Sequence, residues 1–286
     1  MPKLMTTKSN QPNTSNQPQA DNLDIVWQHI RREIQSAAAS EPALASFFHA
    51  TILNHDSLES ALSYHLANKL ASQQISALQV REIIDEALHA DAQIGEAIRE
   101  DIRAVYDRDS ACNEYNLPLL YFKGFQALQS YRVSHWLWRQ GREQIALFLQ
   151  SHISLMFGVD IHPAAKIGKG ILMDHATGIV IGETTVVEDN VSIMHSVTLG
   201  GSGKQSGDRH PKIRAGVLLS AGAKVLGNIE IGEGAKVGAG SVVLKCVAPH
   251  TTVAGVPATV VGRTRSVNPA LDMNHEISCD SDDCLD

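Results

Sequence analysis

The fold is decided by residues 161–199, which read IHPAAKIGKGILMDHATGIVIGETTVVEDNVSIMHSVTL, and by their continuation over residues 213–243. An aliphatic residue returns every six positions along both segments: Ile161, Ile167, Met173 and Ile179, then Ile181, Val187, Ile193 and Leu199, then Ile213, Leu219, Val225, Ile231, Val237 and Val243. A helix repeats about every 3.6 residues and a flat strand about every two, so neither produces this series. We therefore predict a parallel β-helix with three hexapeptides in each turn, and we expect the coil to be left-handed.

The six-residue register breaks twice, and both breaks carry polar residues. A two-residue slip falls at Ile179–Val180, directly after the segment DHATG at residues 174–178. The second break, from Gly200 to Lys212, reads GGSGKQSGDRHPK and is expected to leave the coil as a protruding loop. Insertions in a repeat commonly carry binding sites, and glycines let the backbone approach a ligand closely. Both breaks are therefore candidate functional sites, with a flexible excursion as the alternative for the loop.

The composition limits the class of protein. The chain of 286 residues has 24 Lys and Arg against 31 Asp and Glu, a net charge of −7. Such a charge gives no general attraction to nucleic acid or to an anionic membrane. The sequence contains neither an apolar run of membrane-spanning length nor the apolar core of a signal peptide. It therefore favours a cytoplasmic protein, and its four cysteines show neither metal-ligand spacing nor a disulfide pattern.

The chain divides into four segments. Residues 1–20 are polar and poor in apolar side chains, so we expect them to be disordered. Residues 21–157 show helical periodicity and are assigned to a helical oligomerisation domain, whose aromatic residues from Tyr121 to Trp138 are interpreted as packing core. Residues 158–262 are assigned to the β-helix, and residues 263–286 to a flexible acidic tail. The predicted fold class is α+β, an all-helical domain followed by a β-helix.

Histidines at the two breaks are the candidates for acid–base chemistry. His175 and His195 each take the third position of a hexapeptide, and the 20 residues between them equal one coil plus the slip. Their side chains are therefore expected to lie close together on successive coils. A histidine oriented by a carboxylate is the usual general base, and Asp160, near the edge of the preceding coil, is the orienting candidate for His175. Arg209 and His210 belong to the predicted loop.

Several motifs between Tyr115 and Pro257 resemble those of bacterial serine O-acetyltransferases: PLLYFKGF at 118–125, VDIHPAAKIG at 159–168, DHATG at 174–178, SVTLGG at 196–201, GDRHPKI at 207–213 and AGVPA at 254–258. A hexapeptide repeat by itself is common to many acyltransferases, but DHATG together with GDRHPK is far more restrictive. The resemblance implies transfer of acetyl from acetyl-CoA to the hydroxyl of L-serine, which gives O-acetyl-L-serine, the precursor of cysteine. Acetyl-CoA is then a co-substrate, and neither a tightly bound cofactor nor a metal is implied.

The resemblance also implies roles for individual residues. His175 matches the catalytic base of the family and Asp160 its orienting acid, and the imidazolium can then protonate the departing CoA thiolate. The residues that match family positions holding the amino acid are Asp109, Asp174, Arg209 and His210. The small residues expected beside the pantetheine arm of CoA are Gly201, Gly203, Ala221, Gly222 and Ala239.

Partners follow from the same resemblance. The family forms trimers in which each active site is shared between the coils of adjacent subunits, and helical domains join two trimers into a hexamer. Cysteine is implied as a feedback inhibitor that competes in the serine site. Family members also dock their C-terminal tail, which typically ends in isoleucine, in O-acetylserine sulfhydrylase. This chain ends Cys284-Leu285-Asp286, which departs from that pattern and leaves docking of the tail open.

Three other functions stay open at the level of sequence. A γ-type carbonic anhydrase would bind zinc between subunits, and His175 with His195 is the pair best placed for it. A non-catalytic trimeric scaffold would make the polar residues at the breaks incidental. Another hexapeptide acyltransferase would act on a sugar or a different amine. The glycine-rich loop and Arg209-His210 argue against the carbonic anhydrase, because hydration of CO2 has no need of them.

Overall fold

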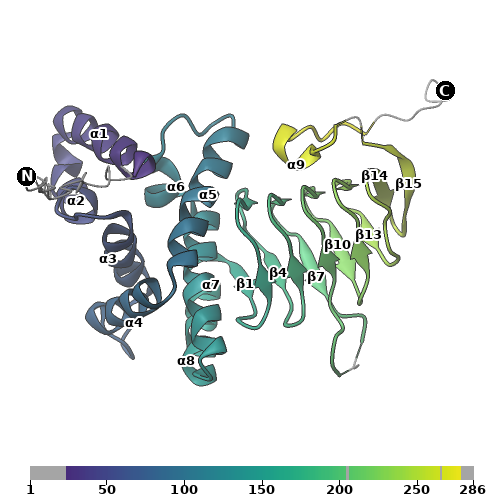
Figure 1. The fold of residues 1–286 in the computed structure, drawn as a ribbon, viewed down its shortest axis with the longest axis horizontal. Helices are drawn as coiled ribbons and strands as arrows, with labels where there is room; N and C mark the ends of the chain where they lie inside the picture. The colour runs from purple at the N-terminus through teal and green to yellow at the C-terminus, as the bar shows by residue number, and fades with distance from the viewer. Residues whose placement is uncertain (1–23, 204–205, 265, 278–286) are drawn as a thin grey trace, which may run out of the picture.

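The computed structural model describes residues 24–203, 206–264 and 266–277, so the predicted disorder at residues 1–20 lies outside the described chain. A helical part precedes a parallel β-solenoid, and the two lie end to end (Figure 1). The helices of the first part are α1 (Ile25–Ser40), α2 (Ala45–Phe48), α3 (Leu58–Leu70), α4 (Ala77–Ala90), α5 (Ala92–Arg108), α6 (Asn116–Tyr121), α7 (Lys123–Arg139) and α8 (Glu143–Phe157). A 3₁₀ turn (Pro42–Leu44) and a π-helical turn (His49–Leu53) flank α2.

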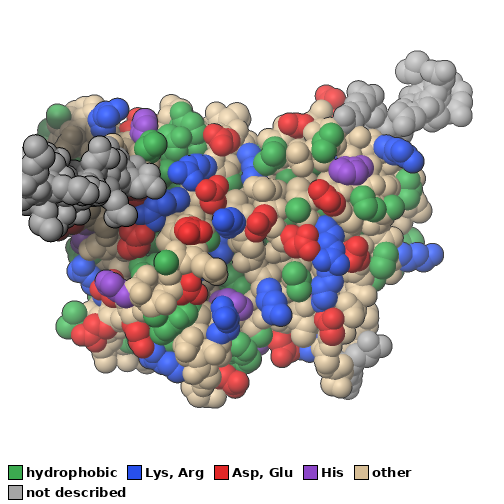
Figure 2. All heavy atoms as spheres, in the orientation of Figure 1, with side chains coloured by type: hydrophobic (Ala, Val, Ile, Leu, Met, Phe, Trp, Pro, Cys, Tyr) green, Lys and Arg blue, Asp and Glu red, His purple; other side chains and the backbone are tan. Residues whose placement is uncertain are grey.

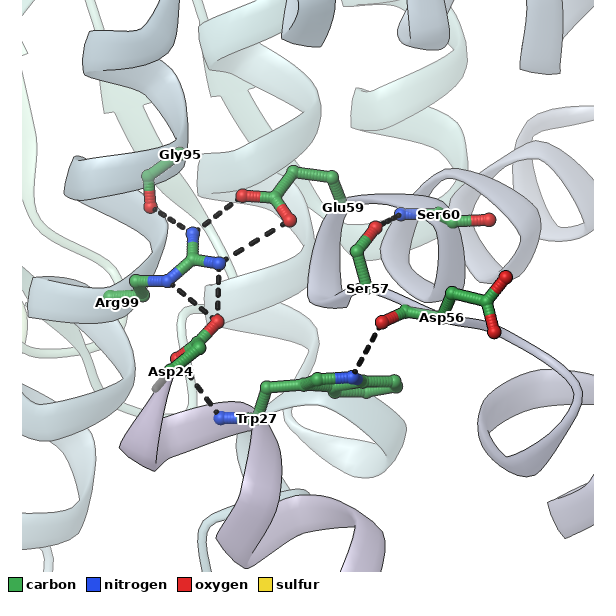
Figure 3. Close-up of polar contacts among 8 residues, drawn as sticks. All are labelled: Asp24, Trp27, Asp56, Ser57, Glu59, Ser60, Gly95 and Arg99. Carbon is green, nitrogen blue, oxygen red and sulfur yellow. Dashed lines mark hydrogen bonds and ion pairs between the residues drawn. The ribbon is translucent and has the colours of Figure 1, made fainter. Parts of the chain in front are cut away.

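A cluster of charged groups joins α1 to α3 and α5 (Figure 3). Asp24 caps α1 by accepting a hydrogen bond from the N–H of Trp27 at 3.2 Å. The guanidinium of Arg99, on α5, donates to Asp24 with Nε at 2.9 Å and to Glu59 on α3 with Nη1 at 2.5 Å. The three charged side chains are between 23% and 31% exposed. Charge-assisted hydrogen bonds are stronger than neutral ones, so Arg99 fastens three helices together.

We expect Arg99→Met to lower the free energy of unfolding by about 2 kcal/mol, because two partly buried carboxylates would lose their charged donor. Urea denaturation of the purified protein measures this loss. Arg103→Ala is the matched control, since Arg103 lies on the same helix and pairs with Glu100 at 2.7 Å, but these side chains are 43% and 44% exposed. The control should change stability by about 0.5 kcal/mol or less. Equal losses in the two variants would contradict the role given to Arg99.

A buried ion pair attaches the helices to the first coil of the solenoid. Asp101 on α5 has no exposed surface, and its Oδ2 lies 2.6 Å from Nη2 of Arg132 on α7. The same carboxylate accepts from the N–H of Ile171 at 2.9 Å, and Arg132 donates to the carbonyl oxygen of Gly168 at 2.8 Å. Ile171 and Gly168 both belong to the first coil. Because buried charges need partners, this network orients the helical part on the solenoid.

The solenoid starts directly after α8, which Gly158 ends in the left-handed region at φ 67°. Its strands are β1 (Val159–Ile161), β2 (Lys166–Ile167), β3 (Leu172–Met173), β4 (Ile179–Ile181), β5 (Val186–Val187), β6 (Ser192–Ile193), β7 (Thr198–Gly200), β8 (Lys212–Ile213), β9 (Leu218–Leu219), β10 (Lys224–Leu226), β11 (Glu230–Ile231), β12 (Lys236–Val237), β13 (Val242–Val243), β14 (Thr251–Gly255) and β15 (Ala258–Arg263). They form sheet A (β1-β4-β7-β10-β13), sheet B (β2-β5-β8-β11) and sheet C (β3-β6-β9-β12-β14-β15). All pairs are parallel except β14 with β15.

The predicted aliphatic series fills the interior of the solenoid. Every member is at most 4% exposed except Ile167, which is half-buried. The series repeats every six residues because each turn of the coil contributes one short strand to each of the three sheets. The α+β fold class with a parallel solenoid is therefore confirmed.

Strand pairing locates both register breaks. Val159 pairs with Ile179, a shift of 20 positions, whereas Val180 pairs with Thr198, a shift of 18. The two extra residues are taken up in the corner between β3 and β4, residues 174–178. The longer break lies between β7 and β8 and extends away from the coil, as predicted (Figure 1). Both breaks are thus insertions at corners that leave the sheets intact.

The segment after β15 differs from the predicted flexible tail at residues 263–286. Helix α9 (Pro269–Asp272) returns over the solenoid toward α5 (Figure 1), and its Ala270 is fully buried. The hydroxyl of Ser192 donates to the carbonyl oxygen of Ala270 at 2.8 Å, and the ammonium of Lys236 donates to that of Glu276. The segment is therefore anchored on the solenoid by the buried Pro269 and Ala270 and by these two hydrogen bonds. Residues 278–286 lie outside the described chain.

On the face shown in Figure 2, Lys and Arg side chains are interspersed with Asp and Glu over both the helical part and the solenoid. Arg214 forms two ion pairs, with Glu188 at 2.7 Å and with Glu230.

Among the helices of the described chain, none has the length and apolar character needed to cross a membrane.

Candidate active site

A pocket of about 640 Å³ lies where the helical part meets the first corner of the solenoid. The end of α5, the turn between α6 and α7, and the corner after β3 surround it. The residues that line it include Asp109, Tyr121, Phe122, Lys123, Gly124, Asp174 and His175. One chain therefore brings three of the candidate residues, Asp109, Asp174 and His175, to a single cavity.

His175 is presented to this pocket by a strained corner. Its φ is 52° and that of Ala176 is 56°, a region that costs free energy for residues other than glycine. The side chain of His175 is 79% exposed, and its Nε2 lies 4.0 Å from Oδ1 of Asp174. The two-residue slip in the sequence thus becomes a turn that aims an imidazole outward, where it can take a proton from a bound hydroxyl.

His195 takes the equivalent place one coil later. The pairing of Met173 with Ile193 stacks the two corners, and the ring centroids of His175 and His195 are 6.2 Å apart. The predicted proximity of these histidines is confirmed. Within the described ranges, no group of three or more His, Cys, Asp or Glu residues is arranged to hold a metal ion.

The N-terminal turn of α7 forms the wall beside His175. A Cβ added to Gly124 would lie 2.1 Å from the carbonyl oxygen of Met173, so only glycine lets α7 pack this closely on β3. Lys123 reaches across and donates to the hydroxyl of Thr177. These contacts fix the distance between the helical part and the corner that carries His175.

Three aromatic residues line the pocket, Tyr121, Phe122 and Phe125, and none of them was among the predicted site residues. The sequence assigns the whole aromatic run to packing core, which is correct for Phe125 and Tyr131, both buried. Tyr121 is 51% exposed, and it lines the pocket together with Phe122. The motif PLLYFKGF that carried the resemblance was the available signal, but periodicity alone does not separate buried aromatic residues from pocket-lining ones.

Asp109 ends α5 and begins the loop to α6. Its carboxylate accepts a hydrogen bond from the N–H of Ala111 at 2.9 Å. Glu33 on α1 holds the far end of the loop by accepting from the N–H groups of Tyr115 at 3.1 Å and Asn116 at 2.9 Å. Because hydrogen bonds hold the loop at both ends, they keep Asp109 in position at the pocket.

Arg209 and His210 lie in a second cluster, where the loop between β7 and β8 returns to the coil. Nη2 of Arg209 is 2.6 Å from Oε2 of Glu183, and this hydrogen bond is the main reason that the pKa of Glu183 lies below its ordinary value. His210 is 7% exposed, and burial first, then the neighbouring Arg209, lowers its pKa. The cluster offers a guanidinium beside a neutral imidazole, which suits recognition of a carboxylate.

Strand β4 separates the two clusters within one chain. His175 precedes this strand, and Glu183, which holds Arg209, follows it. Over the described ranges of the chain, no hydrogen bond or ion pair joins the cluster of His175 to that of Arg209. The candidate substrate-binding residues therefore lie at two corners of the solenoid, and a single chain does not bring all of them together.

Asp160 lies on β1 and pairs in register with Val180 of sheet A. Its Oδ1 accepts a hydrogen bond from Nε2 of Gln150 at 2.7 Å. Of the carboxylates in the described residues, only that of Asp174 comes within 4.0 Å of a ring nitrogen of His175. The orienting role of Asp160 therefore stays a prediction.

Three residues predicted to face CoA extend the line of the two histidines. Pairing in sheet C stacks the inward residues Met173, Ile193, Leu219 and Val237 on one another. The residues two positions after each of these form one column, namely His175, His195, Ala221 and Ala239. Gly222 joins this column because its N–H donates to the carbonyl oxygen of His195 at 2.9 Å. Gly201 and Gly203 lie elsewhere, in the loop that leads to Arg209. Small residues in the column leave its backbone accessible to a long, flat ligand.

Comparison with known proteins gives consistent matches for both parts of the chain. The family model "Serine acetyltransferase, N-terminal" matches residues 26–130, and the bacterial transferase hexapeptide model (six repeats) matches residues 210–245. A serine acetyltransferase of Salmonella typhimurium is 59% identical over 258 residues, which cover 90% of this chain and 94% of that protein.

Solved structures agree. The crystal structure of serine acetyltransferase from Vibrio cholerae has a TM-score of 0.87 and 62% identity, and covers 88% of this chain and 97% of that chain. A serine acetyltransferase in complex with cysteine has a TM-score of 0.86 and 58% identity, and covers 88% of this chain and 98% of that chain. The serine acetyltransferase of Brucella abortus in complex with coenzyme A has a TM-score of 0.84 and 53% identity, and covers 85% of this chain and 98% of that chain. By sequence and by structure, this chain belongs to the serine acetyltransferase family.

Proposed function

We propose that this protein transfers the acetyl group of acetyl-CoA to the hydroxyl of L-serine, with O-acetyl-L-serine and CoA as products, the first step from serine to cysteine. The observation that carries the proposal is the pocket that the exposed imidazole of His175 shares with the carboxylates of Asp109 and Asp174. Relatives that hold CoA or cysteine support it. The carbonic anhydrase and the scaffold lose their support, because neither accounts for similarity to serine acetyltransferases over 90% of the chain.

His175 acts as general base in the proposed reaction. A serine hydroxyl is a weak nucleophile near neutral pH, so its proton passes to the imidazole as the oxygen attacks the thioester carbonyl. The new C–O bond forms a tetrahedral intermediate, and its collapse breaks the C–S bond. The imidazolium then returns the proton to sulfur, and CoA leaves as the thiol. The reaction balances without an acyl-enzyme.

We infer that neighbouring subunits supply the two halves of the serine site. Asp109 and Asp174 of one subunit can hold the ammonium group, and Arg209 with His210 of the next can hold the carboxylate. The outer face of sheet A separates the two clusters and carries an exposed apolar residue, Val180. We therefore place a trimer contact along sheet A.

The helical part supports a dimer of such trimers. The large apolar residues exposed on its surface include Ile25, Leu44 and Leu78. Isolated exposed apolar residues are normal, so the proposal rests on the family resemblance together with these residues. Analytical ultracentrifugation measures the assembly.

Inhibition by cysteine follows from the same site. Cysteine has the ammonium and carboxylate groups of serine, so it would occupy both clusters and place its thiol near His175. The structure of a relative in complex with cysteine supports this proposal. Docking of the tail in a sulfhydrylase depends on residues outside the described chain, so it stays open. The cytoplasmic location stays a prediction.

Arg209→Ala is expected to raise KM for serine by about 30-fold, equivalent to about 2 kcal/mol, because the serine carboxylate would lose a charged donor. KM for acetyl-CoA should change little. Arg214→Ala is the matched control, since Arg214 also pairs with glutamates but on the face of sheet B. Steady-state kinetics with each substrate varied in turn distinguish the two. A wild-type KM for serine in the Arg209 variant would remove this residue from the site.

The activity itself is tested by release of CoA thiol from acetyl-CoA with and without L-serine. Release that depends on serine supports the proposal. Release that prefers homoserine or a sugar would point to another acyltransferase. Absence of release with every acceptor, together with stoichiometric zinc in the purified protein, would revive the carbonic anhydrase.

A further inference from the structure

Thr184 holds both candidate carboxylate-binding residues through one hydroxyl. It lies in the corner after β4, and its Oγ1 accepts from the N–H of Arg209 at 3.0 Å and from the N–H of His210 at 3.1 Å. The same oxygen lies 2.9 Å from Nδ1 of His210, and the N–H of Thr184 donates to that nitrogen at 3.2 Å. One threonine therefore contacts the backbone of both residues and the ring of the histidine.

These contacts determine which ring nitrogen of His210 carries a proton. A backbone N–H can only donate, so Nδ1 of His210 must be an acceptor. The hydroxyl of Thr184 accepts from two N–H groups, which leaves its own proton for donation to Nδ1 at 2.9 Å. A neutral imidazole whose Nδ1 accepts carries its proton on Nε2. Protonation of Nδ1 would cost both hydrogen bonds, so the ring stays neutral.

The other nitrogen is left available to a ligand. The ring lies against Gly182, where an added Cβ would come within 2.1 Å of Nε2, so any side chain at this position would displace the imidazole. Among the residues that the structure describes, Nε2 has no hydrogen-bond partner. It is also not one of the fully buried side-chain atoms that lack a partner in that part of the chain, so a ligand can reach it. It is therefore a donor in need of an acceptor.

We propose that Thr184 is a positioning residue that holds His210 as the Nε2–H tautomer, so that His210 donates to the carboxylate of the amino-acid substrate. This inference rests on the proposed function for the identity of the ligand. A donor at Nε2 can meet a carboxylate but is repelled by an ammonium group, which has no acceptor. Thr184 thereby sets the orientation of serine, with its carboxylate on the side of Arg209 and His210 and its ammonium group on the side of Asp109 and Asp174.

The test compares Thr184→Val with Thr184→Ser and Thr185→Val. Valine keeps the shape of threonine but removes the hydroxyl, whereas serine restores it. Thr185 is fully buried one residue later, and its hydroxyl has no partner among the described residues, so Thr185→Val is a matched control. Two readouts are used, namely the ¹⁵N resonances of the His210 ring, assigned with His210→Gln, and KM for serine and for acetyl-CoA.

In wild type, Thr184→Ser and Thr185→Val, the ring of His210 is expected to be the Nε2–H tautomer. In Thr184→Val the tautomers should mix, because only the longer backbone hydrogen bond remains, and KM for serine should rise about ten-fold or more while that for acetyl-CoA stays unchanged. An Nδ1–H ring in wild type would overturn the proposal. So would a raised KM in Thr184→Val with an unaltered tautomer, which would show a merely structural role. Absence of serine-dependent turnover in wild type would instead reject the proposed function, and the tautomer would still be measurable.

Discussion

Replacement of His175 by asparagine is expected to lower the serine-dependent release of CoA thiol by about 10²–10⁴-fold, the usual effect of removing a general acid–base group. The loss should fall on kcat, because the serine hydroxyl would keep its place but lose the acceptor of its proton. Asparagine is chosen because it tolerates the left-handed region better than most residues, and the corner at His175 has a φ of 52°. Steady-state kinetics at saturating serine and acetyl-CoA measure the effect.

His195→Asn is the matched control for this experiment. His195 occupies the same position of the next coil, with its ring 6.2 Å from that of His175. Because it lies in the column assigned to CoA, its loss should act on KM for acetyl-CoA and leave most of the turnover. Equal losses of kcat in both variants would mean that the column, and not one base, supports the reaction. Full activity of the His175 variant would assign the proton transfer to another group.

Arg132→Met is expected to lower the free energy of unfolding by about 3–5 kcal/mol, the range for breaking a buried ion pair. Arg132 is 8% exposed, and its loss would leave the carboxylate of Asp101, which has no exposed surface, without its cation. The carbonyl oxygen of Gly168 would lose a donor as well. Since these groups join the helices to the first coil, the pocket should open and activity should fall at temperatures below the unfolding transition. Urea denaturation and activity against temperature measure both effects.

The loss of unfolding free energy in Arg132→Met, called the deficit below, should depend on pH. Burial, which outweighs the opposing Arg132, raises the pKa of Asp101. A carboxyl group with a raised pKa in the folded state contributes most to stability at low pH, and the contribution falls as pH rises through that pKa. Loss of Arg132 raises the pKa further, so the deficit should be largest near neutral pH and should shrink toward about pH 5.

A second substitution separates charge from packing at this joint. Asp101→Asn, combined with Arg132→Met, removes the unpaired charge while an amide oxygen can still accept from the N–H of Ile171. The double variant should recover much of the lost stability and should lose the pH dependence. A deficit that is equal at about pH 5 and about pH 7 in the single variant would show that packing, and not the buried charge, is responsible.

Much of the solenoid was predictable because its pattern is local. A residue such as Leu219 or Val237 points inward in any coil with three short strands per turn, whatever precedes it in the chain. The same regularity exposed the interruption at residues 174–178, and it predicted that His175 and His195 would lie together. The sequence by itself thus determined the repeat, the places where it breaks, and the residue types available at those places.

Only the tertiary structure decided how these residues are grouped. Asp109 reaches the pocket of His175 because Gly124 lets α7 pack on β3 and Asp101 pairs with Arg132, contacts between segments that no local period relates. The separation of Arg209 from His175 by β4 likewise depends on the path of the chain around the coil. The physical reason is that periodicity reports which side of an element is buried, whereas a site depends on which elements meet, and buried charges and close backbone contacts decide that.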